Sequence, residues 1–194
     1  VRWSSRTLDA DLLVFGDQII HSHELTVPHP RMMTRRFVLE PAAEVAGDVV
    51  HPVMGWSMQR LFEHLRDALP FFVVFGPDQL AATALAEKLA QASEGQFVPF
   101  AELADSLLYD ALPPAEDIAL QELLAKGPWF TDNWGEEAGL LLAETHATFP
   151  SLRLPKLIIS MASQPADETK PQASATAGLR VPTLNLSPEE NAAW

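Results

Sequence analysis

The sequence contains no cysteine, which excludes a disulfide framework and any metal site built on thiolates. No apolar run approaches the ~20 residues that a membrane-spanning helix needs. No basic-then-apolar leader comes before the first motif, so we expect no secretory signal. With 47% hydrophobic residues, the chain has enough apolar material for a core. These features favour a globular, cytoplasmic protein without a membrane partner.

Basic residues are in the minority, and they are unevenly distributed along the chain, whose formal net charge is −13. Up to residue 66 there are seven Lys or Arg against eight Asp or Glu, whereas beyond it there are six against eighteen. The acidic second part argues against a nucleic-acid partner. The basic groups of the first part surround a carboxylate motif, where an anionic ligand would need them.

Two carboxylates, Asp9 and Asp11, lie one residue apart in the apolar run 8–15, which predicts a buried strand. Side chains at i and i+2 of a strand point to the same face, so the two carboxylates converge. Like charges placed so close repel each other unless a cation lies between them. Mg²⁺ fits, because it takes oxygen ligands at roughly 2.1 Å and is commonly held by one or two carboxylates plus substrate phosphates. The alternative is a pair of carboxylates at a strand end that are either in solvent or ion-paired with Arg6.

Guanidinium and imidazole groups near these carboxylates are suited to phosphate oxygens. They belong to Arg2, Arg6, His29 and Arg35. Carboxylates, a metal and arginines together predict phosphoryl or pyrophosphoryl transfer from a nucleotide. His21 and His23 share a strand face but have no third ligand, so we do not assign them to a metal site.

Local patterns predict the elements of the first part. Residues 7–15 and 18–20 are expected to form strands separated by a turn. Residues 35–39 and 41–45 are expected to form helical turns. After these, Ser57 is a candidate N-cap for a helix whose apolar residues have the spacing of one buried face, namely Met58, Leu61, Phe62 and Leu65.

Pro70 marks a boundary, after which residues 71–75 form a continuous apolar run typical of a strand in a parallel sheet. A turn at 76–78 and a helix at 81–92 complete a strand–loop–helix unit of the kind found in nucleotide-binding proteins. Further along, the patterns predict helices near 117–125 and 136–145, a strand at 156–161 and a polar loop at 163–178.

Five short motifs occur in a fixed order within residues 1–66. They are Arg2-Trp3, Arg6-Thr7-Leu8-Asp9-x-Asp11, Leu25-Thr26-Val27-Pro28-His29-Pro30-Arg31, Arg35 with Phe37-Val38-Leu39, and Pro41-x-x-Glu44. This ordered set resembles the C-terminal half of the 6-hydroxymethyl-7,8-dihydropterin pyrophosphokinases of folate biosynthesis. The resemblance implies transfer of the β,γ-diphosphate of ATP to the hydroxymethyl oxygen of the pterin, with AMP as the second product.

The resemblance also implies roles for individual residues. Asp9 and Asp11 would hold two Mg²⁺ ions between ATP and the pterin, and with Arg6 and Arg35 they are the expected catalytic residues. Phe37 would stack on the pterin ring, although an aromatic at such a position is also typical of a core. The positions expected to line the ATP site are Trp3, Arg6, Leu12, Thr26, His29 and Arg35.

The chain departs from this family pattern in two ways. Ala10 stands where leucine is usual, which we expect to loosen packing on the far side of the strand without affecting the metal. The family's N-terminal half, with the first strands of a ferredoxin-like sheet and most of the pterin pocket, has no counterpart in these 194 residues. We therefore expect residues 1–66 to form a partial ferredoxin-like α+β segment that is inactive alone.

Residues 70–194 resemble, more weakly, the deoxynucleoside kinases, which are P-loop enzymes. The resemblance implies a P-loop-kinase-like parallel α/β domain, so that the whole chain is of the α/β class. The residues that support it are 73–76 with the following helix, 130–134 and 154–159.

The phosphate loop of this second part is degenerate. A working loop has the pattern G-x-x-x-x-G-K-[ST], in which backbone N–H groups and the lysine meet the phosphates. Here Gly76 and Thr83 remain, Ala81 and Ala82 replace the second glycine and the lysine, and Asp78 adds a repelling charge. We therefore predict a kinase-like domain without kinase activity, in which Asp132 is structural.

Two alternatives remain open for the function. The chain is a non-catalytic binding module, with a homodimer contact through the second part, or it is a nucleoside kinase whose phosphate lysine has moved to Lys88. Lys88 lies one and a half helical turns beyond Ala82, which argues against the second alternative. Trp129 and Trp134 are interpreted as core or interface residues rather than as groups that stack on a substrate.

Overall fold

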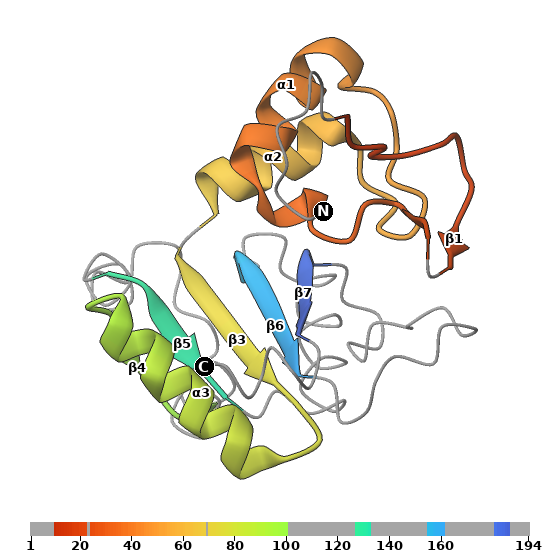
Figure 1. Cartoon of the computed structure of the whole chain (residues 1–194). Helices are drawn as coiled ribbons and strands as arrows, with labels where there is room; N and C mark the ends of the chain where they lie inside the picture. The colour runs from red at the N-terminus through yellow and green to blue at the C-terminus, as the bar shows by residue number, and fades with distance from the viewer. Residues whose placement is uncertain are drawn as a thin grey trace, which may run out of the picture.

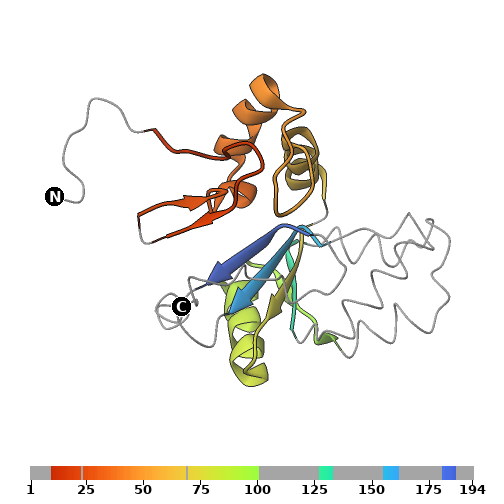
Figure 2. The same cartoon turned by 90° about the vertical axis from the view of Figure 1, so that its right-hand side faces the viewer.

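The computed structural model describes residues 10–22, 24–68, 70–100, 127–132, 155–161 and 181–186. Figures 1 and 2 show two helices and a small hairpin lying together above a parallel sheet, with a third helix along one face of that sheet. The motif residues that the structure describes, from Asp11 to Glu44, belong to the upper group, and the sheet belongs to the second part of the chain.

The first part is built on two packed helices, α1 (Arg36–Ala46) and α2 (Met58–Asp67). Before them come a short antiparallel hairpin, β1 (Ile20–His21) with β2 (Thr26–Val27), and the 3₁₀ turn η1 (Met32–Thr34). The helices and η1 enclose a small apolar core, which consists of Met32, Leu39, Met54, Trp56, Met58 and Leu61.

Helix α2 begins where its sequence predicts. Ser57 has an extended backbone, and its Oγ accepts a hydrogen bond from the N–H of Arg60 at 3.2 Å, which satisfies one of the first free donors of the helix. The four apolar positions also lie as expected, with Met58 and Leu61 buried and Phe62 and Leu65 packed against them. The cap and the periodicity are both local signals, and both are confirmed.

The second part is a five-stranded, fully parallel sheet in the order β4-β5-β3-β6-β7. Its strands are β3 (Phe71–Phe75), β4 (Gln96–Phe97), β5 (Trp129–Thr131), β6 (Leu157–Met161) and β7 (Thr183–Leu186). Helix α3 (Gln79–Ala92) follows β3 and covers one face of the sheet, as Figure 1 shows. The core between them contains Val74, Ala82, Leu85, Ala86, Ala90, Phe130, Ile159 and Leu186.

The predictions for β3, for the helix after it and for the strand at 156–161 are confirmed. β3 is continuously apolar because it is the central strand, with Val73 and Val74 fully buried on opposite faces. The predicted helices at 117–125 and 136–145 and the loop at 163–178 lie outside the described residues.

The strand predicted at 7–15 is wrong for its described portion, residues 10–15. This segment forms no ladder with any other described segment. Its carbonyl oxygens accept one backbone hydrogen bond from the N–H of His29, at Leu13, and one turn bond from the N–H of Gln18, at Phe15. An apolar run becomes a strand only when a neighbouring strand takes its N–H and C=O groups. Along the described part of this run, Leu13 and Val14 pack against the helical core while Leu12 and Phe15 are exposed.

Two boundary predictions in the first part also change. The strand expected at 18–20 is shifted to Ile20–His21, where it pairs with β2. The two turns expected at 35–39 and 41–45 form one continuous helix with Pro41 inside it. Pro41 and Phe37 are both exposed and one turn apart, so the hydrogen bond that Pro41 does not donate falls on the solvent side of α1.

Candidate functional site

A backbone hydrogen bond joins two motif segments, the one that contains Asp11 and the one that contains His29, and we call these the two motif halves. The N–H of His29 donates to the carbonyl oxygen of Leu13 at 2.8 Å. The loop that contains His29 follows the fully buried Val27 and the cis peptide bond between Val27 and Pro28. Asp11 lies two residues before Leu13 and is exposed, so its carboxylate is accessible beside this loop.

The ring of His29 has a defined hydrogen-bonding state. Its Nδ1 accepts the backbone N–H of Arg31 at 3.2 Å. A neutral imidazole that accepts at Nδ1 carries its proton on Nε2. His29 is half-buried, and Nε2 is therefore the atom with which this side chain can donate a hydrogen bond to an anion.

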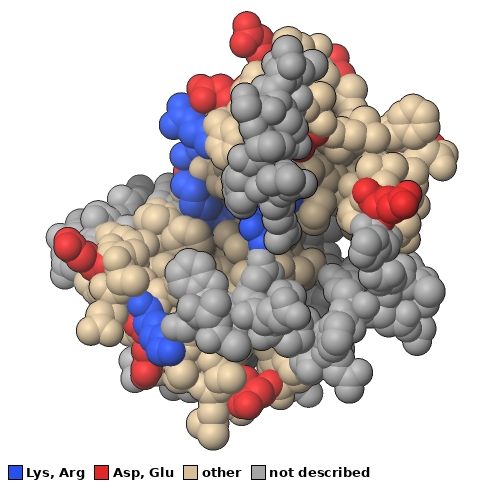
Figure 3. Space-filling model, in the orientation of Figure 1, with Lys and Arg blue, Asp and Glu red and all other residues tan. Residues whose placement is uncertain are grey.

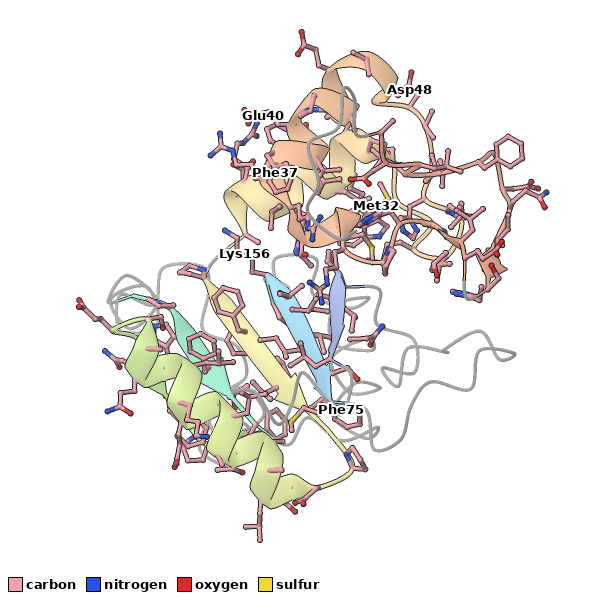
Figure 4. The ribbon with its side chains drawn as sticks, viewed as in Figure 1. Met32, Phe37, Glu40, Asp48, Phe75 and Lys156 are labelled. Atoms are coloured by element: carbon pink, nitrogen blue, oxygen red, sulfur yellow. The ribbon has the colours of Figure 1, made fainter. Side chains whose placement is uncertain are left out.

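Arg35 and Phe37 come together at the start of α1. Arg35 is the N-cap residue of this helix, and its Cζ lies 5.8 Å from the centroid of the Phe37 ring, within the range of a cation–π contact. The Phe37 side chain is 72% exposed, so it is not a core residue. Figure 4 shows Phe37 and Glu40 projecting outward from α1. An exposed aromatic beside a guanidinium is suited to a flat, polar ring.

Arg36, next to Arg35, has a different environment. Its guanidinium is paired with Glu40 one turn along the helix at 3.3 Å, and both side chains are exposed. Figure 3 shows Lys and Arg side chains gathered over α1 and α2 on this face. The arginines of these two helices and of the α1 cap are Arg35, Arg36, Arg60 and Arg66. This basic region belongs to a chain with a net charge of −13.

The other predicted site residues are only partly placed. Leu12 is 46% exposed, and Thr26 lies in β2 opposite His21. Trp3, Arg6 and Asp9 lie outside the described residues, as do Arg2 and His23. The structure therefore brings together Leu13 with His29 and Arg35 with Phe37, and it leaves the distance between Asp9 and Asp11 as a prediction.

The donor set of the described residues is compatible with Mg²⁺ but does not by itself make a complete protein cage. In the described ranges no group of three or more His, Asp or Glu side chains is close enough to hold a metal ion. A site of one or two carboxylates completed by phosphate oxygens is the usual arrangement for Mg²⁺ and requires no such group. The exposed carboxylate of Asp11 fits this kind of site.

A second group of polar residues lies at the carboxyl end of the sheet. Asp78 is the N-cap of α3, and its Oδ1 accepts the N–H of Ala81 at 3.1 Å. Asp132, at the end of β5, is only 4% exposed; it accepts a hydrogen bond from the hydroxyl of Thr83 and another from the N–H of Phe100 at 3.2 Å. These carboxylates are thus hydrogen-bonded within the chain, at the edge where parallel sheets commonly bind ligands.

Two buried or half-buried histidines were not singled out by the sequence. His51 is 3% exposed, and its Nδ1 accepts the N–H of Met54 at 3.1 Å. His64, on α2, reaches the carbonyl oxygens of Pro155 and Lys156. Burial lowers the pKa of both imidazoles, because it disfavours their charged forms. Neither histidine lies in a motif, so only its tertiary contacts identify it.

Trp129 and Lys88, both in the second part of the chain, differ in burial. Trp129 is buried in β5, as expected of a core residue, and Trp134 lies outside the described residues. Lys88 is exposed on α3, whereas Ala82, at the position of the missing phosphate lysine, is fully buried against the sheet. None of the helices in the described part of the chain is long and apolar enough to cross a membrane.

The chain is similar to known folate enzymes over its first part. Residues 1–47 match the profile of the 7,8-dihydro-6-hydroxymethylpterin-pyrophosphokinase family. The folic acid synthesis protein fol1 of Pneumocystis carinii is 44% identical over 71 residues, which cover 34% of this chain and 10% of that protein.

Two bacterial relatives carry the name 2-amino-4-hydroxy-6-hydroxymethyldihydropteridine pyrophosphokinase. The protein from Synechocystis sp. is 45% identical over 64 residues, which are 33% of each chain. The protein from Haemophilus influenzae is 49% identical over 51 residues, 26% of this chain and 32% of the relative. The chain thus spans about a third of the length of these two relatives.

Proposed function

We propose that residues 1–66 are the C-terminal half of a pterin pyrophosphokinase, fused to a degenerate deoxynucleoside-kinase-like domain over 70–194. The observation that carries the proposal is the joining of the two motif halves by the His29–Leu13 hydrogen bond, within a region that matches the pyrophosphokinase profile. The protein of which this chain is part would transfer the β,γ-diphosphate of ATP to 6-hydroxymethyl-7,8-dihydropterin and release AMP.

The described residues suit this reaction through positioning and charge neutralisation. The Nε2–H of His29 and the guanidinium of Arg35 would donate hydrogen bonds to phosphate oxygens. The exposed ring of Phe37 would lie against the pterin. Mg²⁺, held by Asp9 and Asp11, supplies neutralisation of the phosphate charge when bound. Arg6, Trp3, Leu12 and Thr26 are proposed to complete the ATP site.

Binding of ATP to the chain, with and without Mg²⁺, tests this proposal. We expect Mg²⁺-dependent binding that weakens at least about tenfold in Asp11→Ala, because the variant lacks a carboxylate that is proposed to coordinate the metal directly. Asp17→Ala is the matched control, since Asp17 is an exposed aspartate outside the motif. Binding that is indifferent to Mg²⁺ and to Asp11 would contradict the proposed site. An absence of measurable binding in both proteins would mean that the site is incomplete in these 194 residues.

For the second part we propose a kinase-like scaffold without kinase activity. Its central β3, the loop at 76–78 and α3 support the kinase-like assignment. The loss of activity is supported by the buried Ala82, by the Asp78 cap on α3 and by the contact between Thr83 and Asp132. An anionic phosphate approaching the α3 N-terminus would be repelled by the Asp78 carboxylate, and position 82, where the loop pattern has its lysine, offers it only the side chain of an alanine.

The test of this second proposal is phosphorylation of deoxynucleosides by the purified protein. We expect no transfer of phosphate from ATP to any of the four common deoxynucleosides. A measurable transfer that is lost in Lys88→Met would instead support a relocated phosphate lysine. A homodimer through this part remains the alternative role, and sedimentation of the purified chain decides it.

A further inference from the structure

The two parts of the chain meet where α2 ends and β6 begins. The Nε2 atom of His64 lies 3.1 Å from the carbonyl oxygen of Pro155 and 3.2 Å from that of Lys156. The Nζ of Lys156 lies 3.4 Å from the carbonyl oxygen of Ala68, the C-cap of α2. Figure 4 shows Lys156 at the junction of the two parts. The contacts are therefore reciprocal, with one side chain from each part bonded to the backbone of the other.

The chemistry of these contacts fixes their direction. Both partners of His64 Nε2 are carbonyl oxygens, which only accept, so Nε2 carries a proton and donates. The ammonium of Lys156 lies beside the last carbonyls of α2, where the helix dipole favours a positive charge. Each of these atoms is thus matched to its partner in both hydrogen-bonding role and charge.

The ring of His64 is held in place from the side of the first part. Trp56 packs edge-on against it, with centroids 5.1 Å apart and planes at 72°. The guanidinium of Arg60 covers Trp56 at 4.1 Å from the ring centroid. Trp56 is itself buried in the helical core, so the orientation of His64 is set by that core. His64 is therefore preorganised for the backbone at the start of β6.

A second contact joins the parts near the motif. The turn η1 lies next to β7, the strand that pairs with β6. This turn stands between His29 and Arg35, and its first residue, Met32, is fully buried in the helical core. The sheet therefore touches the first part at α2 and at the turn that separates two of the motif side chains.

We propose that the parallel-sheet part acts as a docked scaffold for the motif-bearing part, through the reciprocal contacts of His64 and Lys156 and through the contact between β7 and η1. The surface of the first part formed by α2 and η1 is thus covered by the amino-terminal end of the sheet of the same chain. The opposite, carboxyl end holds the Asp78 cap and the Thr83–Asp132 contact. Only the consequence for ATP binding rests on the proposed function; the docking itself does not.

Amide hydrogen exchange on the full chain, without ATP or pterin, tests the docking. In His64→Ala we expect about two- to tenfold faster exchange, the change for one or two lost hydrogen bonds, in residues 155–161 as well as in α2. His64→Gln keeps an N–H donor near the position of Nε2 and should restore the protection of 155–161. His21→Ala, an exposed histidine in β1, is the matched control and should change neither segment.

A second pair of variants covers the case in which His64→Ala does not fold. Lys156→Met removes the ammonium but keeps the apolar stem, and it should speed exchange in the last turn of α2. Lys88→Met, on α3, should not. Faster exchange in α2 alone after His64→Ala, with 155–161 as protected as in the unaltered chain, would overturn the proposal. Equal rates of amide exchange in the last turn of α2 in Lys156→Met and Lys88→Met would also overturn the proposal.

Discussion

The backbone N–H of His29 donates a 2.8 Å hydrogen bond to the carbonyl oxygen of Leu13. This bond connects the loop that carries the motif histidine to the segment that carries Asp11. The bond does not depend on either side chain, so substitutions of Asp11 or of the His29 ring test the chemistry of the site without removing this connection.

Phe37→Ala should affect pterin binding without affecting stability. The side chain is 72% exposed, so we expect the free energy of unfolding to change by less than about 0.5 kcal/mol. Loss of a stacked ring should weaken pterin binding by about two- to tenfold. Thermal unfolding and a pterin titration on the same samples measure the two effects. Val45→Ala, also exposed on α1, is the control, and an equal loss of pterin binding in both variants would count against a stacking role.

Asp78→Ala should destabilise the second part by about 1 kcal/mol, because the variant removes the side-chain acceptor for the N–H of Ala81. Asp78→Ser retains an oxygen that can cap the helix, and we expect it to be near neutral. Urea unfolding of both variants gives the comparison. Unchanged stability in Asp78→Ala would show that the carboxylate is not a structural cap, which would weaken the case for a blocked phosphate site.

Asp132→Ala should destabilise the second part by about 1–3 kcal/mol in total, because the N–H of Phe100 loses this buried acceptor and the hydroxyl of Thr83 keeps only the carbonyl oxygen of Gln79. Thr83→Val removes only one of the two contacts and should cost less. A double variant that loses no more than Asp132→Ala alone would confirm that the two side chains act as a pair. Additive losses would contradict a direct coupling between them.

The stability of the protein should fall in mild acid. Burial lowers the pKa of His51 and His64 below about 6.5, the ordinary value of an imidazole, so between pH 6.5 and the lowered pKa the unfolded chain binds more protons than the folded one. Stability is therefore full above about pH 6.5 and decreases as the pH falls through that window. Protonation of Nδ1 would also break the bond that His51 accepts from Met54.

His51→Asn isolates the share of His51 in this acid sensitivity. The amide oxygen of asparagine can accept the Met54 N–H without titrating. Unfolding midpoints measured between pH 7.5 and 5 should decline less in this variant than in the unaltered chain, whereas the exposed-site variant His21→Asn should behave as the unaltered chain does. Parallel declines in all three proteins would contradict the assignment to His51.

The sequence predicts those elements whose signals are local. The cap and spacing at Ser57 locate α2, and the apolar run at 71–75 locates the central strand. The run at 10–15 is also largely apolar but lacks a strand partner among the described residues, so its pattern is misleading. β4 is too short for a periodicity to stand out, and its place depends on pairing with β5.

The site shows the same division between local and long-range information. The motif residues His29, Arg35 and Phe37 can be selected from the sequence, because each lies in an ordered pattern. The tautomer of His29 cannot be predicted from the sequence, because it depends on the hydrogen bond that Nδ1 accepts from the N–H of Arg31. The contact of His64 with the carbonyl oxygen of Lys156 joins segments that are far apart in the sequence, and no spacing of residues predicts it.

The most direct test of the account is the formation of AMP from ATP and 6-hydroxymethyl-7,8-dihydropterin, with Mg²⁺, by the complete reading frame that contains these 194 residues. We predict AMP and diphosphorylated pterin in equal amounts, and a kcat/KM lowered by about 100-fold or more in Asp11→Asn but unchanged in Asp17→Asn. An AMP yield that does not depend on the pterin, or full activity in Asp11→Asn, would contradict the assignment of this chain to pyrophosphoryl transfer.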